Sequence, residues 1–130
     1  MTDRDARACV VGVAVVVLVW LGVMERAVRL QADGIEATAQ QDFARAEEHF
    51  RAARFLNPDT TPDLNRSYVY EASSRSRQAT ALLEDVVRRE PDNRSAWGLL
   101  EEFTRQRDPV TSARARVALR RLDPMNARPR

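Results

Sequence analysis

Residues 43–58, FARAEEHFRAARFLNP, decide the fold that later parts of the chain repeat. Apolar residues in this stretch recur with the spacing of one helical face, and charged residues occupy the other faces. The apolar face carries Phe43, Ala46, Phe50 and Ala53. A proline cannot continue a helix and restricts the residue before it, so Pro58 predicts that this amphipathic helix ends at Asn57.

Two later segments end in the same way, because Pro91 and Pro124 follow Pro58 at intervals of 33 residues. The glycine- and proline-free runs before them, 73–90 and 110–123, also carry apolar stripes. These stripes are Ala79, Leu82, Leu83 and Val86 in one run, and Ala115, Ala118, Leu119 and Leu122 in the other. A further helix fits between successive prolines, with Thr61, Asn93 and Asp108 as the expected N-caps. The chain is therefore expected to be all-α, each unit being two helices and a proline stop.

This pattern resembles the tetratricopeptide repeat, a helix–turn–helix unit of 34 residues. The first unit matches at Gly34, Phe43, Ala46, Phe50, Ala53, Leu56 and Pro58, the second at Ala79, Leu83, Val86 and Pro91, and the third at Trp97, Leu100, Leu119, Leu122 and Pro124. Ser112 and Arg116 depart from it. The resemblance implies a right-handed array of about three antiparallel helix hairpins over residues 25–126, followed by a tail, 127–130. A generic array of helical hairpins is the alternative.

Toward the N-terminus, residues 8–24, ACVVGVAVVVLVWLGVM, contain no charge. A helix of this length is about 25 Å long, close to the thickness of the hydrocarbon core. It predicts a single transmembrane helix after a short tail, 1–7. No glycine or proline interrupts residues 23–33, so the span is expected to continue into the first of about six helices. The alternatives are a buried core helix and a signal peptide, with cleavage after Leu30-Gln31-Ala32.

The orientation of the span is balanced, because Arg4 and Arg7 precede it and Arg26 and Arg29 follow it. A short N-terminal tail usually stays in the cytoplasm, which favours a repeat domain outside it. A membrane helix that runs directly into such repeats resembles the tail of bacterial O-antigen ligase or polymerase proteins. That resemblance implies the inner membrane of a bacterium and work on envelope polysaccharide.

The composition argues against an enzyme. One cysteine and one histidine form neither a disulfide within the chain nor a zinc site of Cys/His type. His49 lies at a polar position of its helix. Adjacent carboxylates such as Glu47 and Glu48 diverge by about 100° on a helix and cannot converge on one metal or substrate atom. No catalytic residue, metal or cofactor is therefore expected.

Binding is the remaining class of function, and the first helices of the units are expected to line a concave groove. The candidate groove residues are Gln31, Ile35, Thr38, Tyr68, Glu71, Ala72, Trp97, Glu101 and Arg105. A second candidate is a basic patch on the last helix, comprising Arg114, Arg116, Arg120 and Arg121, because residues 105–130 hold eight arginines and two acidic residues. Its expected partner is an anionic lipid surface or an acidic protein. With a net charge of only +2, nucleic acid is an unlikely partner.

Two functions follow from these features. The first is a membrane-anchored module that recruits a partner protein, without catalytic activity. The second is an accessory or structural subunit of a bacterial membrane complex, in which the transmembrane helix makes the main contact.

Overall fold

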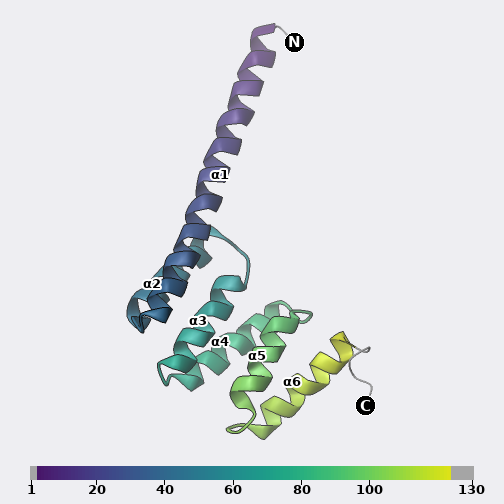
Figure 1. The fold of residues 1–130 in the computed structure, drawn as a ribbon. Helices are drawn as coiled ribbons and strands as arrows, with labels where there is room; N and C mark the ends of the chain where they lie inside the picture. The colour runs from purple at the N-terminus through teal and green to yellow at the C-terminus, as the bar shows by residue number, and fades with distance from the viewer. Residues whose placement is uncertain (1–2, 124–130) are drawn as a thin grey trace.

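The computed structural model describes residues 3–123, with side chains from Val10 onward, as a row of six helices (Figure 1). The helices are α1 Asp3–Ala39, α2 Phe43–Leu56, α3 Thr61–Ala72, α4 Ser76–Arg89, α5 Arg94–Thr104 and α6 Pro109–Leu122. No strand occurs within this part of the chain. The expected all-α fold is confirmed, as is the continuation of the apolar span into the first domain helix. Pro124 and the expected tail 127–130 lie outside the described residues.

The arrangement follows from short turns between helices of similar length. Each helix from α1 to α6 packs against the next, and α3 also contacts both α1 and α5. Figure 1 shows that the first half of α1 extends beyond the row, while its second half lies beside α2. One helix near the N-terminus is thus long and apolar enough to span a membrane, with a mean hydropathy of 2.1. Only 6% of its apolar window is buried, so it is not a core helix of the described array.

The helix starts are capped largely as the sequence predicts. The Asp42, Asn93 and Asp108 side chains accept hydrogen bonds from backbone amides in the first turns of α2, α5 and α6. At α3 the expectation is wrong by one residue, because the helix begins at Thr61 and Thr60 takes the cap position without a side-chain cap bond. The Thr60 hydroxyl instead donates to Glu90 at 3.0 Å and accepts from the Asn93 amide at 3.0 Å.

The hydrophobic core forms two clusters. The smaller joins α1, α2 and α3 through Ala37, Ala46, Phe50 and Val69, with Phe43 packed against it. A Cβ at Gly34 would lie 2.6 Å from Cε1 of Phe50, so the glycine permits the close approach of α1 and α2. The larger cluster joins α3 to α6 through Tyr70, Ala79, Leu83, Val86, Val87, Ala96, Leu99, Leu100, Phe103 and Ala115.

A buried carboxylate supplements the smaller cluster. Asp63, at the start of α3, accepts hydrogen bonds from Arg54 of α2 at 3.1 Å and from Arg89 of α4 at 2.9 Å. Arg66 of α3 lies 3.5 Å from its other oxygen. A buried charge is tolerated only when it is paired and hydrogen-bonded, and here guanidinium groups from three helices supply that pairing.

A second polar contact joins α2 to α3. Glu47 of α2 accepts hydrogen bonds from the Tyr70 hydroxyl and from Arg75, both at 2.9 Å. The guanidinium of Arg75 also lies 4.5 Å from the centre of the Tyr70 ring, within the range of a cation–π interaction. Partial burial would raise the pKa of Glu47, but the hydrogen bonds from Arg75 and Tyr70 outweigh it and lower that pKa.

Candidate binding face around Arg107

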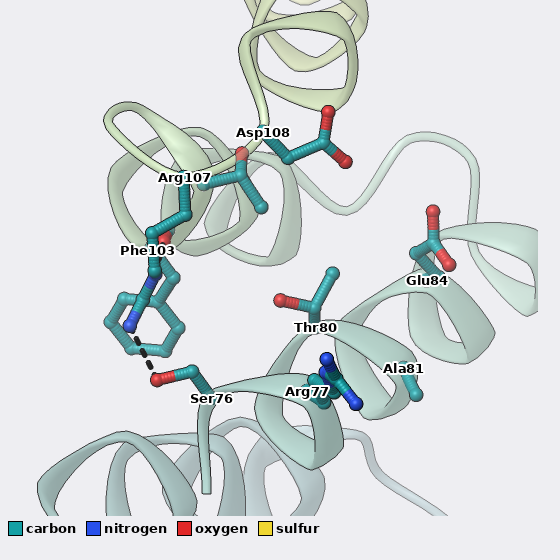
Figure 2. A pocket seen from close by; sticks show the side chains of 9 residues that line it. Ser76, Arg77, Thr80, Ala81, Glu84, Phe103, Arg107 and Asp108 are labelled. Atoms are coloured by element: carbon teal, nitrogen blue, oxygen red, sulfur yellow. Dashed lines mark hydrogen bonds between the residues drawn. The ribbon is translucent and has the colours of Figure 1, made fainter. Parts of the chain in front are cut away.

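Arg107, in the turn between α5 and α6, connects three elements of the array. Its Nη2 donates to Oε1 of Glu71 on α3 at 2.5 Å and to the Phe103 carbonyl of α5 at 2.6 Å. Its Nη1 donates to the hydroxyl of Ser76, the first residue of α4; this bond is the dashed line in Figure 2. These bonds hold a half-exposed guanidinium in one position, where it separates neighbouring surface hollows.

Three hollows are lined by Arg107, and each has a volume of about 410 to 480 Å³. The hollow in Figure 2 lies between the first half of α4 and the end of α5, with Arg77, Thr80 and Glu84 on its α4 side. A second lies between α3 and the turn after α5, and Arg105 contributes to its wall. Together with Arg107, they form the face that we call the Arg107 face.

The charges on the Arg107 face are mixed. Arg75, Arg77, Arg105 and Arg107 line the three hollows together with Glu71, Glu84, Glu102 and Asp108. Oε2 of Glu71 is buried and has no hydrogen-bond partner. Hydrogen bonds from the Thr111 side chain and backbone lower the pKa of Asp108. Such a lining suits a polypeptide that offers both carboxylates and backbone or cationic donors, rather than a ligand of one charge.

Three of the predicted groove residues belong to this face. Tyr68 of α3 meets the ring of Phe103 edge to face, with ring centres 5.6 Å apart. Glu71 pairs with Arg107, and Glu71 and Arg105 line the same hollow. Ala72, also expected in the groove, is exposed at the end of α3.

Trp97 and Glu101 lie on the side of α5 that meets α6. Trp97 lines a hollow with Arg88 of α4 and Arg114 of α6, and its indole donates to the Pro91 carbonyl at 2.8 Å. Glu101 lies 3.5 Å from Arg116 of α6. A hydrogen bond from Arg105 lowers the pKa of Glu101, against the opposing effect of burial. These two residues are therefore not brought together with Tyr68.

The remaining groove candidates lie on α1. Ile35 is exposed, and Gln31 and Thr38 are half-buried. The Thr38 hydroxyl donates to the Gly34 carbonyl at 2.8 Å, within its own helix. None of the three lines the hollows around Arg107.

The basic patch on α6 has partners within the molecule. Arg114 pairs with Glu84 of α4 at 2.7 Å, and Arg121 lies 3.8 Å from Asp92, ahead of α5. With the Arg116–Glu101 contact, three of the four arginines face acidic residues of the body. The fourth, Arg120, is exposed. The excess of positive charge on α6 is thus matched in part by the acidic helices on which it packs.

The sequence analysis did not identify Arg107 or Ser76. Arg107 follows the end of α5 and belongs to no periodic stripe, and its partners Glu71 and Ser76 are 36 and 31 residues away. Phe103 was recognised only as a member of the α5 apolar set. A helical pattern places residues on faces, but contacts between turns depend on how successive hairpins stack.

Within residues 10–123, no group of three histidine, cysteine, aspartate or glutamate side chains is placed to hold a metal ion. His49 accepts a hydrogen bond from Arg45, one turn earlier on α2, at 3.3 Å. No protein-family model matches the chain, and no curated protein matches it.

Proposed function

We propose that this chain is a membrane-anchored helical-repeat module that binds a partner protein, and that it carries out no reaction of its own. The observation that carries the proposal is the continuity of α1. Every large apolar side chain from Val10 to Leu21 is exposed, whereas Ala27, Gly34 and Ala37 of the same helix are buried against the array. One rigid element is therefore both a membrane span and a part of the domain.

The same continuity supports an uncleaved anchor. Cleavage after Ala32 would remove the buried Ala27 and leave the next buried position, Gly34, two residues from a new chain end. The packing of α1 against α2 would then lose most of its length. We place the anchor in a bacterial inner membrane, with the repeat domain outside the cytoplasm.

We assign the array to the tetratricopeptide type. Helix pairs end at prolines 33 residues apart, α3 contacts both α1 and α5, and a glycine allows the two helices of the first unit to approach closely. In such an array the first helices of successive units lie side by side, and here α3 and α5 carry Tyr68, Glu71 and Phe103 of the Arg107 face.

The proposed ligand is an extended polypeptide segment of a neighbouring membrane protein. Mixed charges and two exposed or half-exposed rings offer side-chain contacts, and tethering both proteins in one membrane raises their effective concentration. Weak contacts at the Arg107 face are then sufficient for recruitment.

Site-specific photo-crosslinking in intact membranes tests this function. A photoreactive amino acid replaces Tyr68, which is 48% exposed, or Val117 of α6 as a control of similar exposure, 59%. We expect a discrete adduct from position 68 and none from position 117. Equal adducts from both positions, or none from position 68, contradict the proposal.

The exposed apolar half of α1 favours the alternative of an accessory subunit that contacts its complex within the bilayer. A photoreactive residue in place of Leu18 tests it in the same membranes. An adduct from position 18 without one from position 68 supports the alternative. Recovery of the chain in the soluble fraction, starting near Asp33, would contradict both functions.

A further inference from the structure

The last turn of α2 presents the most exposed large apolar side chain of the described array. Phe55 is 89% exposed, and it lines a hollow of about 470 Å³ between α1 and α2. Leu30, Ala52 and Leu56 supply the rest of the apolar wall, and Arg26, Glu48 and Arg51 lie at its polar side. A single exposed apolar residue is ordinary on a protein surface, so its position must carry the argument.

The pairing of α1 with α2 determines that position. Phe50 packs against Gly34, and one turn later Phe55 and Leu56 share the hollow with Arg26 and Leu30. The end of α2 is therefore level with the part of α1 that directly follows the uncharged run. Figure 1 shows α2 lying against α1 at the point where α1 leaves the array.

The distance from the span matches the interfacial layer of a bilayer. With a rise of 1.5 Å per residue, Arg26 and Leu30 lie about 3 and 9 Å beyond Met24 along α1. The headgroup region on each side of the hydrocarbon core is about 5–7 Å thick. When the uncharged run fills the hydrocarbon, Phe55 is thus at the level of the headgroups.

We propose, on the basis of the anchoring proposed above, that this end of α2 is a second membrane contact, in which Phe55 inserts among the phospholipids. Aromatic side chains favour the interfacial layer of a bilayer. The Arg26 and Arg51 guanidinium groups lie beside the apolar wall, where they can reach lipid phosphates, and Glu48 is exposed to water. The occupant of the hollow is therefore a phospholipid of the same bilayer that α1 crosses.

A second contact changes how the domain is held. A single span leaves the array free to tilt, whereas a span and a bound helix end restrict its orientation. The Arg107 face, built from α3, α4 and the end of α5, then lies at a constant height above the membrane.

Lipid-borne quenchers test this contact in the full-length chain. Cys9 is replaced by serine, and a fluorophore is attached to cysteine in Phe55→Cys, Val110→Cys or Leu18→Cys. Each variant is reconstituted in vesicles of phosphatidylcholine and phosphatidylglycerol. Val110 is the matched control, because it is 80% exposed and apolar but belongs to the start of α6, at the other end of the row.

We expect a quencher near the headgroups to reduce the emission at position 55 as strongly as a quencher deep in the acyl chains reduces it at position 18. Emission at position 110 should not change with either. If position 18 is quenched and position 55 behaves like position 110, the second contact is wrong and the anchor stands. If position 18 is not quenched, the anchor itself is wrong.

A protein occupant gives a different result. A blue-shifted fluorophore at position 55 that escapes lipid quenching, and whose shift grows with the protein-to-lipid ratio, shows that a second copy covers the hollow. That outcome overturns the proposal. Because Phe55 is so exposed, its replacement is expected to leave the circular dichroism spectrum unchanged, which excludes unfolding as the cause of a negative result.

Discussion

The part of the array next to the apolar span and the part farthest from it are stabilised by different means. Between α1, α2 and α3 the apolar cluster is small, and buried or half-buried ion pairs at Asp63 and Glu47 supplement it. Between α3 and α6 the apolar cluster is larger. At Ala96, one period after Asp63, the buried carboxylate is replaced by a methyl group.

The difference shows how a repeat can vary without changing its fold. A buried carboxylate adds little net stability when its partners are present, but losing a partner is costly, because the charge then stays buried. Hydrogen bonds to Asp63 come from α2, α3 and α4, so they require these helices to meet in one arrangement. We therefore expect the part next to the span to be the more sensitive to polar substitutions.

The largest expected effect is the loss of the main side chain of the smaller cluster. Phe50→Ala should destabilise the array by about 3–5 kcal/mol, and Leu100→Ala in the larger cluster by about 2–5 kcal/mol. Denaturant unfolding in detergent micelles, followed by circular dichroism, measures both. Because repeats contact only their neighbours, hydrogen exchange should rise first in α2 for Phe50→Ala and first in α5 for Leu100→Ala. A loss below about 1 kcal/mol for Phe50→Ala would show that its cluster does not hold α1 and α2 together.

A second, smaller effect is expected at the buried carboxylate. Asp63→Asn keeps the shape of the side chain but removes the charge that three guanidinium groups share, and hydrogen bonds to charged groups contribute about 1.5–3 kcal/mol. The expected loss of unfolding free energy is of this size. Asp85→Asn is the control, because its pairs with Arg88 and Arg89 are more exposed, and we expect a change of less than about 1 kcal/mol. Equal effects at both positions would contradict a special role for Asp63.

Two glycines give a matched pair on the two sides of the comparison. A Cβ at Gly34 would meet three atoms of the Phe50 ring within 2.9 Å, whereas a Cβ at Gly98 of α5 would meet nothing within 4 Å. Alanine is favoured over glycine inside a helix by about 0.8–1 kcal/mol. Gly98→Ala should therefore raise the unfolding free energy by about 0.5–1 kcal/mol. Overpacking typically costs about 1–3 kcal/mol, so Gly34→Ala should be neutral to destabilising. Stabilisation by Gly34→Ala would show that Phe50 can move aside.

Much of the fold can be predicted from local rules. Prolines that stop helices, three capping side chains and the uncharged run lead to six helices and to the continuity of α1. The same rules fail at Thr60, because its hydroxyl bonds to Glu90 and Asn93 in the next unit. They also assign Trp97 to the groove, since the face of a helix that meets a given neighbour depends on how the hairpins stack.

The candidate site was less predictable for the same reason. Tyr68 and Glu71 follow from their positions on α3, but Arg107 gains its importance from bonds to residues in other helices. The pairing of α6 arginines with Glu84 and Glu101 likewise depends on stacking. A count of charges along the chain shows an excess but not what faces it.

The smallest expected effect is a pH dependence of the contact between α2 and α3. Since the Arg75 and Tyr70 hydrogen bonds hold the folded-state pKa of Glu47 below its ordinary value of 4.5, the ionised form stabilises the folded state. This contribution is fully present above about pH 4.5 and is lost as the pH falls through the lower, folded-state pKa. Hydrogen exchange of α2, measured from neutral to acid pH, should therefore increase below about pH 4.5. Glu47→Gln should exchange faster at neutral pH and show less of this increase, whereas Glu48→Gln, at the exposed neighbouring position, should behave as the unaltered chain. If Glu47→Gln retains the full acid dependence, other carboxylates are responsible and the Glu47–Tyr70–Arg75 contact does not stabilise this joint.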